Sequence, residues 1–296
     1  MAEPSVTLVA GERAWALAAG GPLEIDLPEP ARVGIAEWLA SGKLELPILP
    51  EASATIMSMT TSDDYRLQDL VDVIQRDPSL AAHLLRVANS PLYAPRYPFV
   101  SLRHAIGRLG VTELRRVAVT IACQTQVFRV RGWENELYEL FLHCLATALY
   151  ATDIAKLVHL EEEPVFLGGL LHDVGYAVVL QGVDALNKDL GIELSRATTA
   201  QVAARFHTEL GARLVERWGL APRFAEVIHH HHEIVSQPTT NLAVIELADA
   251  LAYGGPELVS RLAEHGMFDS LHLPAGAVDE LAAKRPQVLA LAAALM

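Results

Sequence analysis

Apolar residues recur at helical spacing along most of this chain of 296 residues, and this spacing restricts the fold more than any other feature. Residues that commonly begin or end helices interrupt the pattern. Asp77 precedes Pro78, Ser101 begins a pattern that stops at Gly110, and Thr112 stands where the next N-cap is expected. Leucine and alanine are abundant, whereas runs of β-branched residues are short. The sequence therefore predicts an all-α protein, and its 51% of hydrophobic residues suffices for a large core.

The helical patterns fall into two groups separated by a natural seam at residues 129–136. After the seam, long patterns cover residues 137–159, 164–181, 198–218, 222–234 and 240–253. Residues 1–43 differ, because glycine pairs and prolines favour a short irregular or hairpin arm there, followed by a short helix that stops at Gly42. We expect an N-terminal extension over 1–43, a helical lobe over 44–131, and a second lobe over 132–296 packed against the first.

Composition restricts the location and the partners of the chain. The formal net charge of -13 repels nucleic acid, so we expect neither DNA nor RNA as a partner. Only 2 cysteines occur, which suits a reducing cytoplasm rather than a disulfide framework. The first residues lack a basic n-region, and no apolar run approaches the roughly 18 residues of a membrane span. We therefore predict a cytoplasmic protein without membrane contacts.

A local excess of arginine runs against this acidic balance. Residues 101–131 contain a single acid, Glu113, and six arginines: Arg103, Arg108, Arg115, Arg116, Arg129 and Arg131. These arginines could lie on solvated helix faces, or they could form a patch for an anionic ligand or an acidic partner surface. The stretch AIGRLGVTELRRVAV also has the rhythm of a helix-turn-helix, so a DNA-binding regulator is a further alternative.

Histidines and acids occur inside segments that otherwise belong in a core. His172 and Asp173 lie within FLGGLLHDVGYAVVL, and a buried carboxylate must be paired, protonated or bound to a metal. His143, His207 and Asp249 occupy similar apolar surroundings, and a run of four histidines covers 229–232. Imidazole and carboxylate together suit Fe, Mn, Zn or Ni rather than Ca or Mg. The alternative is a set of hydrogen-bonded His–Asp pairs in the core.

The order of these residues resembles the HD superfamily of metal-dependent phosphohydrolases, and the wider set resembles the HD-GYP cyclic di-GMP phosphodiesterases. In that resemblance His231 and His232, directly before Glu233, match the histidine pair of the family. His229 and His230 are then not ligands. The resemblance implies a divalent transition-metal site, with two ions, and Asp173 as the bridging and catalytic residue. The implied metal ligands are His143, His172, Asp173, His207, His231, His232 and Asp249.

A second resemblance is carried by VIQRDPSLAAHLLRVANSPLY, SLRHAIGRLGVTELRRVAV and ELGARLVERWGLAPRFAEVIHHHHE, and it covers about residues 44–255. Together these blocks are similar to the HDOD domain, an all-helical relative of HD-GYP. It implies an HD-like bundle of two packed lobes in bacterial signal transduction, acting on a signalling protein partner or an anionic nucleotide ligand. Tyr176 stands where HD-GYP proteins carry lysine, and no GYP follows Glu233. We therefore expect cyclic di-GMP hydrolysis to be absent or very slow, with a metal-dependent phosphohydrolase of nucleotides or cyclic dinucleotides as the alternative.

Overall fold

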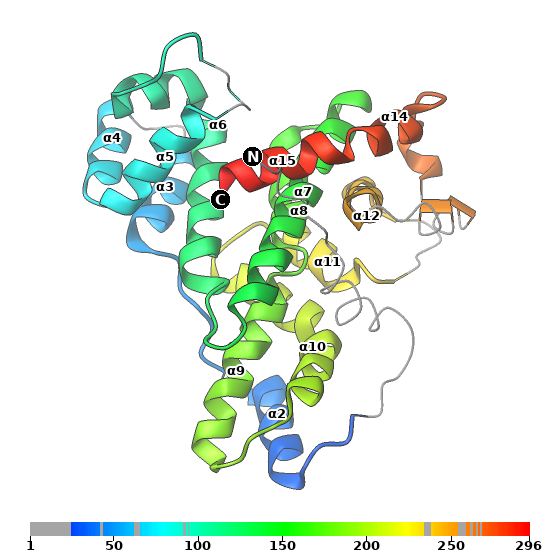
Figure 1. Ribbon diagram of the computed structural model, residues 1–296. Coiled ribbons are helices and arrows are strands. Elements are labelled where there is room, and N and C mark those ends of the chain that lie inside the picture. Colours follow the sequence, from blue (N-terminus) through cyan, green and yellow to red (C-terminus); the bar gives the residue numbers. More distant parts are fainter. Residues whose placement is uncertain are drawn as a thin grey trace, which may run out of the picture.

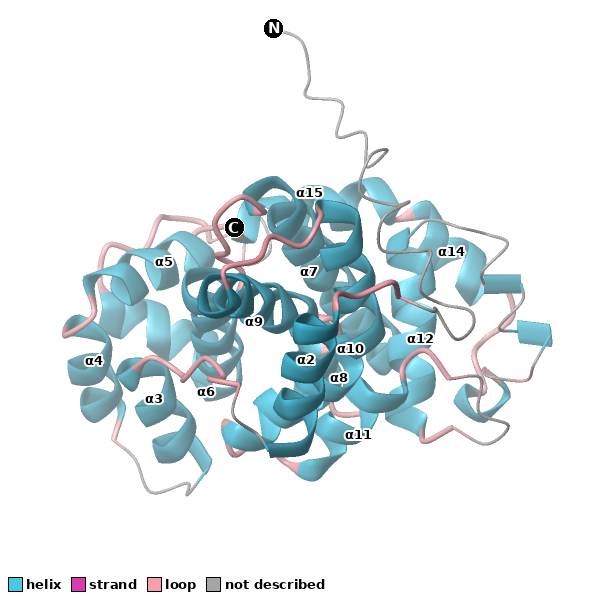
Figure 2. Cartoon of the chain, turned by 90° about the horizontal axis from the view of Figure 1, so that it is seen from below, coloured by secondary structure: helices cyan, strands magenta, loops and turns pink. Residues whose placement is uncertain are grey.

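A computed structural model describes most of the chain, and every regular element in the described part is a helix (Figure 1, Figure 2). The described residues are 25–41, 44–61, 66–90, 93, 95–233, 238–253, 259–260, 263–264, 266 and 268–296. The prediction of an all-α fold is confirmed. The irregular or hairpin arm was expected over residues 1–30, of which residues 1–24 lie outside the described residues and Glu29 already begins a helix. The helix expected before Gly42 is α2 (Glu29–Ser41), and it packs against α9 (Val174–Leu190) of the second lobe.

The first lobe is a group of four helices around α6. Its members are α3 (Glu51–Thr61), α4 (Leu67–Gln75), α5 (Pro78–Ala88) and α6 (Leu102–Ala122). Asp77 caps α5 as predicted, because its carboxylate accepts hydrogen bonds from the backbone N–H groups of Ser79 and Leu80. Ser101 occupies the N-cap position of α6 without a side-chain hydrogen bond. Gly110, at φ 79°, kinks α6 where the sequence predicted a break, and Thr112 follows the kink.

The second lobe contains the helices that follow residue 133. Its helices are α7 (Glu134–Leu157), α8 (Glu162–Leu171), α9 (Val174–Leu190), α10 (Arg196–Arg217), α11 (Pro222–His230), α12 (Thr240–Tyr253), α14 (Ala277–Ala283) and α15 (Arg285–Leu295), with a 3₁₀ turn, η2 (Asp269–Leu271). α7 packs on α8, α12 and α15, while α10 packs on α9 and α11. The helix pattern expected to run to residue 234 ends earlier, at His230.

The two lobes share one continuous hydrophobic core. A short π-helix, η1 (Cys123–Val127), follows α6, and Gly132 at φ 82° turns the chain into α7 at the predicted seam. The C-terminal helix α15, red in Figure 1, packs on both α5 and α7. His83 in α5 donates its Nε2–H to the backbone oxygen of Leu295, 3.0 Å away. The last helix therefore ties the first lobe to the second.

Two glycines allow α9 and α10 to approach at backbone distance. A Cβ on Gly175 of α9 would lie 1.8 Å from the backbone oxygen of His207 in α10. Facing it, a Cβ on Gly211 would lie 2.9 Å from Cγ2 of Ile228 and 3.2 Å from the backbone nitrogen of Gly175. Only glycine fits at such a crossing. This contact fixes the distance between the start of α9 and the part of α10 that carries His207.

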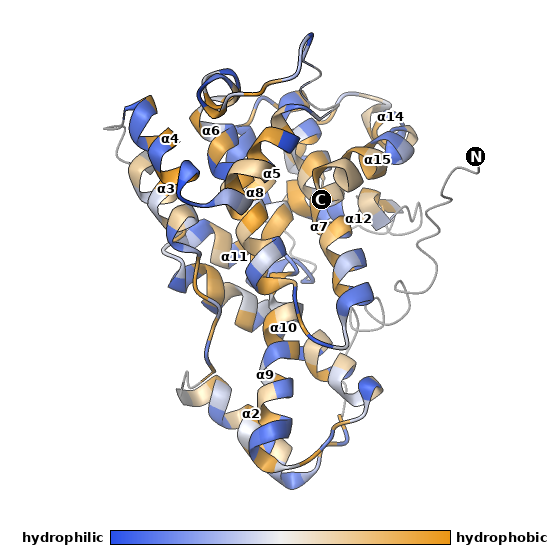
Figure 3. Cartoon of the chain, turned by 60° about the vertical axis from the view of Figure 1, so that its left-hand side comes forward, coloured by the Kyte–Doolittle hydropathy of each residue, from blue (hydrophilic) through white to orange (hydrophobic). Residues whose placement is uncertain are grey.

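Two helical stretches of the described chain are long and apolar enough, by composition, to cross a membrane: residues 134–157 and 162–190. Within the protein, 72% and 94% of their most apolar windows are buried. Figure 3 shows hydrophobic residues, coloured orange, along these helices. Their apolar character is therefore accounted for by the core, since fully buried helices are apolar on every side.

Candidate metal centre

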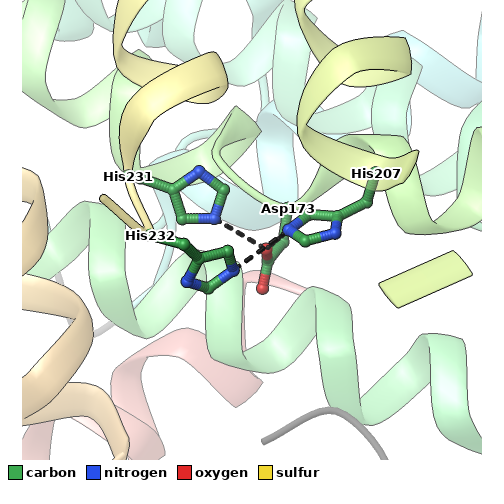
Figure 4. A group of neighbouring side chains, drawn as sticks. All are labelled: Asp173, His207, His231 and His232. Carbon is green, nitrogen blue, oxygen red and sulfur yellow. Dashed lines mark hydrogen bonds and ion pairs between the residues drawn. The ribbon is translucent and has the colours of Figure 1, made fainter. Parts of the chain in front are cut away.

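Six helices and their ends bring the predicted site residues together. His143 lies on α7, His172 and Asp173 join α8 to α9, and His207 lies on α10. His231 and His232 follow the end of α11, and Asp249 lies on α12. Their potential ligand atoms form two groups, within each of which all atoms lie within 4.8 Å of one another. The first group is Asp173, His207, His231 and His232 (Figure 4), and the second is His143, His172 and Asp249.

Asp173 stands between the two groups, with one carboxylate oxygen toward each. Its Oδ1 lies 3.2 Å from Nε2 of His231 and 3.6 Å from Nε2 of His207. Its Oδ2 lies 3.3 Å from Nε2 of His172, which is 3.7 Å from Oδ1 of Asp249. The two groups are therefore neighbours, and a single carboxylate can serve both.

Three of the histidines are held in the same tautomer by the backbone. Nδ1 of His172, His207 and His231 lies 2.7–2.8 Å from the carbonyl oxygen three residues earlier, and a carbonyl can only accept. Each Nδ1 therefore carries the proton, and in the neutral ring each Nε2 presents a lone pair to the cluster. Hydrogen bonds of this kind, made by the ring nitrogen that faces away from the ion, orient histidine ligands in metal sites.

Several of these atoms lack a hydrogen bond despite being buried. Nε2 of His143, Nε2 of His172 and Oδ1 of Asp249 have no hydrogen-bond partner of acceptable geometry among the described residues. The imidazole of His143 nevertheless lies 2.8 Å from Asp249. Buried polar atoms normally have partners, and a divalent cation would satisfy all three at once. The donor set of imidazoles and carboxylates fits a transition metal.

The electrostatics of the cluster favour neutral rings at His207 and His232, an ionised carboxylate at Asp173 and a protonated ring at His172. Burial lowers the pKa of His207 to about 4 despite the opposing effect of Asp173. Desolvation of the ring, reinforced by His231 and His207, lowers the pKa of His232 to about 2, although the residue as a whole is exposed. Burial acts to raise the pKa of Asp173, but His172 and His231 outweigh it and hold that pKa well below its usual value. Burial acts to lower the pKa of His172, yet Asp173 and Asp249 raise it to about 9. A bound cation would take the place of that proton.

The run of four histidines divides at the end of α11. His231 is the C-cap residue, so the chain leaves the helix between the two pairs. His231 is 2% exposed and Nε2 of His232 lies 3.0 Å from Nε2 of His207. His229 is exposed, and Nδ1 of His230 lies 2.9 Å from a carboxylate oxygen of Glu233. His229 and His230 therefore stand apart from the cluster, in keeping with the sequence interpretation.

Two aromatic residues and one acid complete the surroundings. Tyr176, 2% exposed, stacks on His207 with ring centroids 4.0 Å apart, and Tyr253 lies 4.8 Å from His143. The sequence analysis missed Glu246, which is 7% exposed and one helical turn before Asp249. Burial, and then the charge of Asp249, raises the pKa of Glu246 to about 9. The sequence signal that could have identified Glu246 is its position as an acid among the apolar residues of α12.

The six arginines of residues 101–131 do not form one patch. Arg116 is 6% exposed and pairs with Glu113 at 2.6 Å, while Arg115 pairs with Glu163 at 2.5 Å. The remaining four are exposed: Arg103, Arg108, Arg129 and Arg131. Arg115 and Arg116 are thus engaged with glutamates, and the stretch proposed as a helix-turn-helix is a kinked α6 within the first lobe.

Solved structures with the same fold come from several bacteria. A protein from Shewanella amazonensis SB2B, provisionally named a metal-dependent phosphohydrolase, is 21% identical with a TM-score of 0.72, covering 89% of this chain and 97% of its own. A Geobacter sulfurreducens HDOD domain protein of unknown function is 25% identical with a TM-score of 0.66, covering 90% and 98%. A Marinobacter aquaeolei VT8 protein, provisionally named for signal transduction, is 21% identical with a TM-score of 0.64, covering 92% and 67%.

Sequence comparison gives a more specific result. An uncharacterized protein of Treponema pallidum (strain Nichols) is 24% identical over 202 residues, which are 66% of this chain and 39% of that protein. The chain thus spans about two fifths of the length of this curated relative. The HDOD domain matches residues 46–234, which include both helical lobes up to the end of the histidine run. With well over half of its length matched, the chain belongs to the HDOD family.

Proposed function

We propose that this chain is a regulatory HDOD module that acts by binding a signalling protein partner or a small anionic ligand. We further propose that it holds two divalent transition-metal ions, Fe, Mn, Zn or Ni, in the cluster around Asp173. The observation that carries this proposal is a full set of inward-facing imidazole and carboxylate donors next to a buried tyrosine. Its buried free thiols, Cys123 and Cys144, suit a reducing compartment such as the cytoplasm.

The two groups of donors divide the ligands between the two ions. His207, His231 and His232 would hold one ion, and His143, His172 and Asp249 the other. Asp173 would bridge them, since Oδ1 faces the first group and Oδ2 faces His172. When bound, such ions supply positive charge and can lower the pKa of a bound water to about 7.

The residues around the donors favour binding over phosphodiester hydrolysis. Within the described part of the chain, the side-chain hydrogen bonds and ion pairs of the donor residues involve neither lysine nor arginine. Tyr176 is uncharged, since burial raises its pKa well above the usual value. Loss of one positioned transition-state donor typically costs about 10²–10³ in kcat. We therefore expect little or no turnover of cyclic di-GMP.

The histidine run provides a matched test of the metal site. The double variant His231→Ala/His232→Ala removes two donors, whereas His229→Ala/His230→Ala removes the same atoms outside the cluster. We expect elemental analysis of the purified proteins to find metal in the wild type and in the second variant, and much less in the first. Equal metal content in the two variants would contradict the assignment.

A second candidate function is a metal-dependent phosphohydrolase, and the position of Asp173 between the groups favours it. A carboxylate shared by two ions is a common feature of sites that activate water. Turnover of nucleotides and cyclic dinucleotides, measured with metal-loaded protein, separates the candidates. Robust turnover that disappears in Asp173→Ala would move the protein to the enzyme class, and the absence of turnover in fully loaded protein favours the binding module.

A further inference from the structure

A cavity of about 220 Å³ lies between the two lobes, away from the candidate metal centre. Helices α5 and α6 of the first lobe and α7, α8 and α15 of the second contribute to its wall. Glu162, which lines it, begins α8, whereas His172 follows the other end of that helix, roughly 15 Å away at 1.5 Å per residue. The cavity is therefore a separate site, and none of the metal-donor residues lines it.

The volume restricts what the cavity can hold. Pockets for drug-sized ligands and nucleotides are larger, at roughly 300–1,000 Å³. The occupant is thus of the size of an amino acid. Part of the wall is apolar, formed by Val87, Val117, Leu149, Phe166 and Leu295.

The polar part of the wall contains an arginine with unused hydrogen-bonding capacity. The Arg116 side chain is 7% exposed, and its Nη1 donates to Glu113 at 2.6 Å. Its buried Nε has no hydrogen-bond partner among the described residues, and its Nη2 lies 3.8 Å from Glu162, which is too far for a hydrogen bond. Nε and Nη2 form one edge of the guanidinium, the edge that binds a carboxylate through two parallel hydrogen bonds. Phe166 lies against the face of the group, 5.0 Å from Cζ, and holds it in place.

Glu113 of the wall is held by Arg116 and by the Tyr93 hydroxyl, whereas Glu162 and Lys156 are loosely held. Glu162 lies 3.8 Å from both Arg116 and Lys156, and it forms ion pairs rather than close hydrogen bonds with them. Side-chain exposure is 40% for Glu162 and 56% for Lys156, so both can reorient. A ligand carboxylate that takes Arg116 and Lys156 away from Glu162 leaves that glutamate without a cation. A ligand that also carries an ammonium group compensates it.

We propose that this interlobe cavity binds a small zwitterion of the α-amino acid type with an aliphatic side chain. The carboxylate of the ligand pairs with Arg116 and Lys156, its ammonium group pairs with Glu162, and its side chain contacts Val117 and Leu149. Because both lobes contribute to the wall, the bound ligand stabilises their arrangement. The cavity is then an input site of the regulatory module.

The proposal is tested by calorimetric titration of the full chain with L-leucine, L-isoleucine and L-valine. We expect one saturable site with a dissociation constant of about 1 mM or lower for at least one of them. 4-Methylpentanoate lacks the ammonium group of leucine, and 3-methylbutylamine lacks its carboxylate. Both should bind at least about tenfold more weakly, the loss expected for one charge-assisted hydrogen-bonding group.

Three variants locate the site. Arg116→Lys keeps the charge beside Glu113 but removes the two-pronged edge, and it should weaken binding about tenfold or more. Val117→Phe fills the cavity and should abolish binding, whereas Arg108→Lys, an exposed change on the same helix, should leave it unaltered. If Val117→Phe does not fold, the ligand affinity of Arg116→Lys tests the location of the site by itself.

Three results would overturn the proposal. The first is no saturable binding of any of the three amino acids at about ten times the expected dissociation constant. The second is binding that persists undiminished in Arg116→Lys. The third is binding of 4-methylpentanoate as tightly as leucine, which would make the site one for simple carboxylates.

Discussion

Substituting Gly175 by alanine should disrupt both the packing of α9 on α10 and the candidate metal centre. The new Cβ would lie 1.8 Å from the backbone oxygen of His207 and 2.6 Å from its carbonyl carbon. Carbon atoms in favourable contact lie about 3.5–4.0 Å apart, so the helices must separate by well over an ångström. No rotamer change can relieve a contact with backbone. Overpacking of this kind costs about 1–3 kcal/mol and occasionally more, and we expect the upper end, about 3 kcal/mol.

Because the displaced backbone belongs to His207, metal content should fall together with stability. The assay is urea denaturation followed by far-ultraviolet circular dichroism, with metal content measured on the same samples. Gly107→Ala is the matched control, since a Cβ there meets nothing within 4 Å. As an exposed helical position it should be neutral or stabilising by up to about 1 kcal/mol. A Gly175→Ala protein with wild-type stability and metal content would refute the packing argument.

Three further predictions concern buried ionisable groups. Asp173→Ala should lose more metal and show a lower melting temperature than Asp173→Asn, because asparagine keeps the volume and one ligand oxygen; equal values would count against a liganding role. His83 has its pKa lowered to about 4 by burial and by Arg86, so the unfolded chain takes up a proton first and stability should fall as pH drops from 6.5 toward 4. His83→Gln should flatten that dependence in chemical denaturation at several pH values. In protein stripped of metal, the raised pKa of Glu246 means that stability is lost as pH rises from 4.5 to about 9, so Glu246→Gln should be stabilising at pH 8 and nearly neutral at about pH 4.

The local structure of the first lobe could be predicted where one residue determines it. Asp77 forms its cap because an aspartate before a proline has the right side chain at the right position. Gly110 breaks α6 because glycine, which has no Cβ, adopts a positive φ without steric cost. Ser101 makes no cap hydrogen bond, although its residue type and position favoured one. Sequence specifies the potential of a side chain to cap, while packing decides its direction.

The candidate site could be recognised from the sequence only in part. His172 and Asp173 stand out because they interrupt an apolar segment, and resemblance selected His231 and His232 from the run of four. Helical periodicity alone extends α11 past all four histidines, whereas the chain leaves the helix at His231. The buried Arg116 was one of six similar arginines in the sequence. Glu113 lies three residues before it on the same helix, but its second partner, Glu162, lies on α8, and sequence spacing does not reveal that pair. Long-range pairing of this kind depends on how the lobes pack.

The placement of α8 links the interlobe cavity to the candidate metal centre. Its first residue, Glu162, lines the cavity, and its C-terminal end continues directly into His172 and Asp173. A Cβ on Gly169 would lie 2.8 Å from Cα of Ala148 in α7, the helix that also carries His143. α8 and α7 are therefore in backbone contact, and a displacement of α8 as a whole would move donors of both groups. By thermodynamic linkage, a ligand that shifts α8 changes metal affinity by the same factor by which metal changes the affinity for that ligand. Titration of the cavity in metal-loaded and metal-free protein measures this factor, and a ratio of one would show that the two ends of α8 act independently.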